Sequence, residues 1–78
     1  MSLTAPITSL FNARRIAIAR CALSAAIAAR GDYPVISDDA VIELLADLRH
    51  FCAARRIDFE KCDRMADAHF ETEIAGGR

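Results

Sequence analysis

The segment between residues 9 and 29 is apolar on two opposite sides when it is drawn as a helix. At 100° per residue, Ile16, Leu23 and Ile27 share one side. The other side carries two large residues and three alanines, namely Phe11, Ile18, Ala22, Ala25 and Ala29. A surface helix of a monomer normally has one apolar stripe. Two apolar sides indicate a helix that is central in its own chain or pressed against a second chain.

The chain is too short to bury both apolar sides of such a helix well. It has 78 residues, and a domain of this size buries only about 60% of the surface that its unfolded chain exposes. Its core is thin as well, because the apolar residues are mostly Ala, Ile and Leu, with five aromatics and no Trp. We therefore expect a homodimer, with a candidate interface on the first helix formed by Phe11, Ile16, Ile18, Leu23 and Ile27.

The cysteines indicate a reducing compartment. Cys21, Cys52 and Cys62 are odd in number and follow no clear secretory signal, so a disulfide framework is not expected and a cytoplasmic location is. An alternative interpretation takes the acid-free, alanine-rich start as a signal or transit peptide. Against a membrane span, Arg20 and Arg30 enclose only nine uncharged residues, whereas about 20 are needed. We expect no membrane partner.

Local signals predict one all-α domain over residues 1–78, with helices at about 9–29, 39–55 and 59–73. Thr8, Ser9 or Asn12 is expected to cap the first helix, and Gly31 to end it in a left-handed conformation. Ser37, Asp38 or Asp39 is expected to cap the second helix, and Asp58 the third. The architecture is therefore a long N-terminal helix followed by an antiparallel helical hairpin, completed by dimerisation.

The apolar residues of the second helix give the clearest amphipathic pattern in the chain. They recur at intervals of three and four: Val41, Leu44, Leu45, Leu48, Phe51 and Cys52. Equal distances from the turn predict that Leu48 and Phe51 meet the first turns of the third helix. They also predict that Leu44 and Leu45 reach further along it, to Met65, Ala66 and His69.

Charge divides the chain into two unequal halves. Residues 1–31 contain four arginines and no acid, whereas residues 32–78 contain all eleven acids and six basic residues. The halves are electrostatically complementary, within one chain or between two. The candidate electrostatic surface combines arginines of the first helix with an acidic stripe on the third: Arg14, Arg15, Arg20, Glu60, Asp63, Asp67 and Glu71. This stripe is either a solvated face or a docking surface for a basic partner.

A helix, a short turn and another helix also suggest nucleic-acid binding. The charge of the third helix opposes this, because residues 58–73 contain six acids and two basic residues, and phosphates would repel them. The arginines of the first helix are a better candidate. However, Arg14, Arg15 and Arg20 lie at about 0°, 100° and 240° and form no single stripe.

Two kinds of chemistry have some of the required residues but not the spacing. His50, Cys52, Cys62 and His69 could converge in a hairpin, yet the paired short spacings of zinc ligands are absent. Cys62 and His69 lie about 10 Å apart along one helix axis, too far for a direct hydrogen bond. We therefore expect no metal, no cofactor, no catalytic residue and no enzymatic activity.

Residues 38–73 resemble short uncharacterised helical proteins encoded on bacterial plasmids, phages and genomes. The stretches that carry the resemblance are Asp47–Cys52, Ile57–Phe59, Cys62–Arg64, Ala66 and His69–Phe70. The chain departs from this pattern at its turn, where Arg55 and Arg56 stand in place of a glycine. The resemblance implies a bacterial origin and no particular activity.

These observations favour a small, non-enzymatic helical module that acts through protein–protein contact, as a homodimer or with a further protein partner. The alternative is a nucleic-acid-binding or regulatory protein that uses the arginines of its first helix. The two functions differ in what the first helix contacts: another protein chain in the first, and nucleic-acid phosphates in the second.

Overall fold

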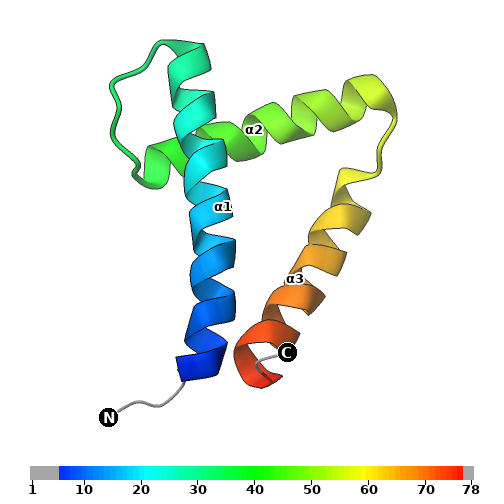
Figure 1. The fold of residues 1–78 in the computed structure, drawn as a ribbon. Coiled ribbons are helices and arrows are strands. Elements are labelled where there is room, and N and C mark those ends of the chain that lie inside the picture. Colours follow the sequence, from blue (N-terminus) through cyan, green and yellow to red (C-terminus); the bar gives the residue numbers. More distant parts are fainter. Residues whose placement is uncertain (1–5, 77–78) are drawn as a thin grey trace.

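The chain is all-α, as the sequence predicts. The computed structural model describes residues 6–76, which form three helices and no strand (Figure 1). These are α1 (Pro6–Arg30), α2 (Asp38–Arg55) and α3 (Phe59–Gly76). The second and third helices are connected as a hairpin by a short turn, and a longer loop of residues 31–37 connects the first two.

The start of α1 differs from the prediction. The helix begins at Pro6, where a proline suits the first turn because the missing N–H has no helical acceptor there. The residues expected to cap it, Thr8, Ser9 and Asn12, therefore lie inside the helix. A proline signal at the first helical position was available in the sequence and is the more accurate guide.

The end of α1 follows the prediction. Gly31 has a φ of 78°, in the left-handed region. Its N–H donates to the carbonyl oxygens of Ile27 at 3.0 Å and Ala28 at 3.1 Å, and the Asp32 N–H donates to Ile27 at 3.1 Å. These bonds satisfy carbonyls that the helix end would leave without a donor.

α2 also ends with a residue in the left-handed conformation, but this residue is not a glycine. Arg56 adopts a left-handed conformation with a φ of 61°, and the Ile57 N–H donates to the Cys52 carbonyl oxygen at 2.8 Å. An arginine therefore occupies the position that usually takes glycine. The start of α3 follows at once, because the Asp58 carboxylate accepts the Lys61 N–H at 3.0 Å, which confirms the predicted cap.

The start of α2 is capped without a side-chain hydrogen bond. Ser37 occupies the cap position with extended backbone, and its side chain makes no capping bond. Asp38 and Asp39 lie in the first turn, where their negative charge interacts favourably with the helix dipole.

The three helices form an open triangular frame. In Figure 1, α2 crosses α1 near the C-terminal half of α1, and α3 returns so that its C-terminal end lies beside the N-terminal part of α1. The molecule measures 42 × 30 × 16 Å. Since one helix with its side chains is about 10–12 Å across, the shortest dimension is about one and a half helix diameters. Its radius of gyration is 14.9 Å, against about 11.5 Å for a compact domain of this length.

Very little of the frame is buried. Ile27 is 5% exposed, and Ala40 and Cys52 are each 8% exposed; these are the buried apolar residues of the described chain. Ile27 and Ala40 line the same hollow where α1 crosses α2, and the small alanine lets the helices approach closely there. Cys52 is buried beside the turn between α2 and α3. The core is therefore thin, as composition predicts, and is divided between two corners.

The predicted packing along the hairpin is wrong beyond the turn. Leu45 is 45% exposed and Met65 is 53% exposed, and the two helices separate from each other along their length (Figure 1). The far end of α3 lies instead against α1, where Ile16 shares a hollow with Phe70 and Ile74 and where Arg15 pairs with Glu73. An α3 helix fixed at that point cannot also lie along α2.

We predict that Ile27→Ala lowers the free energy of unfolding by about 2–4 kcal/mol, because it removes a buried side chain from a site with few neighbours able to fill the space. Ile18→Ala is the matched control, since Ile18 is 59% exposed. Its expected loss is below about 0.5 kcal/mol. Urea unfolding of both variants tests this, and equal losses would contradict the assignment of the core.

A second prediction concerns Gly31. An added Cβ at this position meets no atom within 4 Å, so the cost of Gly31→Ala is purely conformational. We expect a loss of about 1 kcal/mol in the free energy of unfolding, because a non-glycine residue is disfavoured in the left-handed region. Gly31→Asn should lose less, since asparagine tolerates this conformation. Chemical unfolding of the two variants in parallel gives the comparison.

Candidate protein interaction surface

Each corner of the frame carries an arginine–carboxylate pair. Arg30 of α1 pairs with Asp47 of α2, and Arg49 of α2 pairs with Glu60 of α3 at 3.2 Å. Arg15 of α1 pairs with Glu73 of α3 through two hydrogen bonds, of 2.7 and 3.1 Å. The pairs at the α1–α2 and α3–α1 corners join an arginine of the acid-free half to an acid of the other half. The predicted complementarity of the two halves is therefore used within one chain.

The ion pair at the α3–α1 corner shifts the pKa of both of its partners. The side chain of Glu73 is 16% exposed, and its hydrogen bonds from the Arg15 guanidinium lower the pKa of the carboxyl below its ordinary value. The same bonds raise the pKa of Arg15. The Arg15 guanidinium also lies 6.0 Å from the centre of the Phe11 ring.

The candidate electrostatic surface is divided by these pairs. Arg15 and Glu60 belong to the corners and hold the frame together. Within residues 6–76, no ion pair forms at the remaining members of the surface, which are exposed: Arg14, Arg20, Asp63, Asp67 and Glu71.

The candidate interface on α1 is divided as well. Ile27 is buried where α1 crosses α2, so it is not available to a partner, and Leu23 is half-buried. Phe11, Ile16 and Ile18 are 40%, 58% and 59% exposed. Ile16 lines a hollow shared with Phe70 and Ile74 of α3. The side of α1 that carries Ile16, Leu23 and Ile27 thus faces two helices of the same chain, while Phe11 and Ile18 on the opposite side stay exposed.

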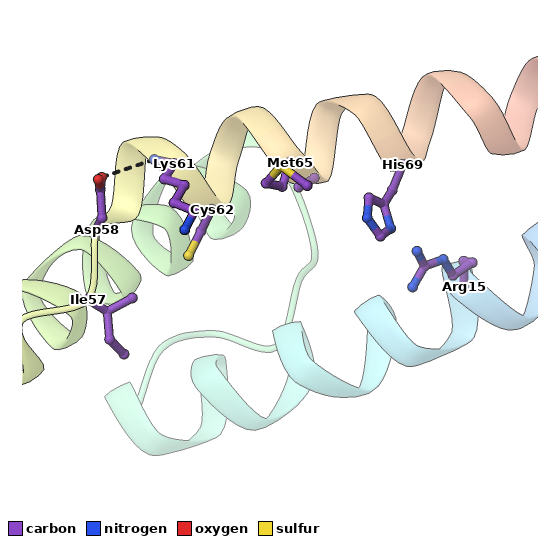
Figure 2. A pocket seen from close by; sticks show the side chains of 8 residues that line it. Arg15, Ile57, Asp58, Lys61, Cys62, Met65 and His69 are labelled. Atoms are coloured by element: carbon purple, nitrogen blue, oxygen red, sulfur yellow. Dashed lines mark hydrogen bonds between the residues drawn. The ribbon is translucent and has the colours of Figure 1, made fainter.

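A groove of about 550 Å³ lies between α3 and α1. Figure 2 shows Cys62, Met65 and His69 along α3, with Arg15 of α1 facing His69 across the groove. Ile57, Asp58, Lys61 and Ala66 complete its lining. The lining therefore mixes apolar side chains with charged or ionisable ones of both signs.

The four cysteine and histidine residues considered for metal or nucleophilic chemistry do not converge. Cys62 and His69 line the groove with Met65 between them (Figure 2), Cys52 is buried at the turn, and His50 is exposed on α2. Across the described part of the chain, no three His, Cys, Asp or Glu side chains are grouped so as to hold a metal ion.

Sequence reasoning missed the most regular exposed apolar surface. Val41, Leu45 and Leu48 of α2 are 43%, 45% and 42% exposed, and Phe51 is 53% exposed. The amphipathic pattern identified these residues but assigned them to the inner face of a closed hairpin. Nothing local in the sequence shows that α3 leaves them uncovered.

Comparison with known proteins identified no relative of the chain. No protein-family model, curated protein or solved structure matches the chain. None of the three described helices combines the length and the apolarity needed to cross a bilayer.

The Arg15–Glu73 pair predicts a pH dependence of stability. Because the folded state lowers the pKa of Glu73, its stabilisation is fully present above the ordinary value of 4.5 and is lost as the pH falls through the lower folded value. We expect the melting temperature of Glu73→Gln to fall less than that of the unmodified chain on acidification below pH 4.5. Glu71→Gln is the control, because Glu71 lies two residues from Glu73 and is exposed. It should keep the full acid loss in thermal melts, and a Glu73→Gln profile parallel to it would contradict the role of the pair.

Proposed function

We propose that the protein is a non-enzymatic helical module that acts through protein–protein contact and functions as a homodimer, in the cytoplasm of a bacterium. The observation that supports this most directly is the open, thin frame, with its large apolar side chains mostly on the surface. Among the residues that the structure describes, sixteen large apolar residues are at least 40% exposed, against three buried apolar residues. A surface of this kind is typical of a chain that completes its core with a partner.

The accessible area supports the same proposal. The chain exposes 6214 Å², whereas a compact monomer of 8.5 kDa exposes about 4,700 Å². The excess, about 1,500 Å² per chain, exceeds the roughly 800 Å² that each partner buries in a standard interface. A dimer interface of ordinary size therefore fits within the surplus.

The nucleic-acid alternative has less support. Two of the four arginines in residues 1–31 are engaged with carboxylates, Arg15 with Glu73 and Arg30 with Asp47. The other two, Arg14 and Arg20, are six residues apart and lie on different sides of α1. Such an arrangement offers phosphates no continuous basic stripe.

Sedimentation equilibrium at micromolar concentration tests the proposal. The expected mass is twice 8.5 kDa, with high helicity by circular dichroism in the same sample. A fully helical monomer at tens of micromolar would refute the homodimer. A gel shift with mixed-sequence DNA at low salt, weakening as salt is raised, would instead support the nucleic-acid alternative.

A further inference from the structure

The exposed apolar residues of α2 form a regular seam. Val41, Leu45 and Leu48 follow one another at intervals of four and three, the spacing that keeps side chains on one side of a helix. We call these three residues the α2 seam. All are between 42% and 45% exposed, so the folded chain leaves a large part of each side chain open to water. α1 crosses α2 on a different side, at Ala40 and Asp47.

Opposite charges stand at the two ends of this seam. Asp38 is in the first turn of α2, and Arg56 directly follows its last residue. Asp38 therefore marks the N-terminal end of α2, and Arg56 lies just beyond its C-terminal end, about 27 Å away along the axis. Within residues 6–76, neither takes part in an ion pair.

We propose that two copies of the chain pair through antiparallel α2 helices, with the α2 seams in contact and Asp38 of each copy beside Arg56 of the other. The inference rests on the proposed homodimer and names the surface that forms it. A two-fold axis between residues 46 and 47 places Leu45 opposite Leu48 of the second copy. The same register brings each Asp38 to the Arg55–Arg56 end of the second α2.

The charges select the antiparallel arrangement over the parallel one. In an antiparallel pair, both ends of the interface bring an acid to an arginine, and the helix dipoles also oppose each other favourably. A parallel pair would place Asp38 beside Asp38 and Arg56 beside Arg56. Isologous contact about a two-fold axis is also the commonest geometry of homodimers.

The competing occupant of the seam is α3 of the same chain. It would have to swing along α2 and close the hairpin, which requires the Arg15–Glu73 pair at its far end to break. A second copy can cover the seam with that pair intact. Closure within one chain is therefore the outcome that would leave the protein monomeric.

The first test compares two apolar positions of similar size and exposure. Leu45→Glu places a charge in the α2 seam, and Ile18→Glu places one on α1, outside it. Sedimentation equilibrium should show a dissociation constant raised about 30-fold or more by Leu45→Glu, as for a central interface residue. Ile18→Glu should leave it within about threefold. Circular dichroism monitors folding of both variants.

The second test uses charge reversal and holds even if Leu45→Glu fails to fold. Asp38→Lys places a positive charge beside Arg56 of the second copy, and Arg56→Glu places a negative charge beside Asp38 of the second copy. Each variant alone should dimerise about 10-fold more weakly than the unmodified chain, because two attractive contacts become repulsive. An equimolar mixture should form a heterodimer at close to the original affinity. Single variants that dimerise as well as the unmodified chain would overturn the antiparallel pairing.

The outcomes separate this inference from the proposed function. A monomeric unmodified chain overturns both. A dimer that survives Leu45→Glu, with unchanged affinity in the charge variants, overturns the α2 pairing and leaves the homodimer standing. Loss of the dimer in Ile18→Glu alone would do the same, and would place the interface on α1.

Discussion

Three arginine–carboxylate pairs hold the corners of this molecule, and the open shape depends on them. Each joins a different pair of helices: Arg30 with Asp47, Arg49 with Glu60, and Arg15 with Glu73. Exposed ion pairs contribute little to stability, since water screens them and ordering two long side chains costs entropy. They can set directions between helices, but they cannot replace a core. Because such pairs orient the chain and so few apolar side chains are buried, apolar contact with another molecule would add the stability that a core normally gives.

The α2–α3 corner shows how an ion pair and a ring cooperate in this orientation. The Arg49 guanidinium lies 4.3 Å from the centre of the Phe59 ring and also pairs with Glu60. Phe59 and Glu60 are the first two residues of α3, so one arginine of α2 contacts the start of the next helix twice. Since Arg56 and Asp58 fix the backbone on either side of the turn, the direction in which α3 leaves is determined over a few residues.

Local features of the fold could be predicted from sequence, and its long-range geometry could not. Gly31 and Asp58 act through backbone groups within a few residues of themselves, so their roles as helix stop and helix cap are visible in the sequence. The path of α3 depends on Arg15 meeting Glu73, which lies 58 residues away. Charge segregation indicated that the halves attract each other but not which residues meet. For the same reason, the apolar stripe of α2 was recognised correctly and assigned to the wrong neighbour.

The thin, open frame also changes how amide protection would be distributed in this protein. In a compact bundle, the slowest-exchanging amides lie in helices shielded by other helices, and their exchange reports global unfolding. Here each helix has two broad faces open to water, so the helical amides of a single frame have little shielding beyond their own hydrogen bonds. Slow hydrogen exchange along one helix of this chain would therefore be a signature of what covers that helix, and would map its contacts with a second molecule.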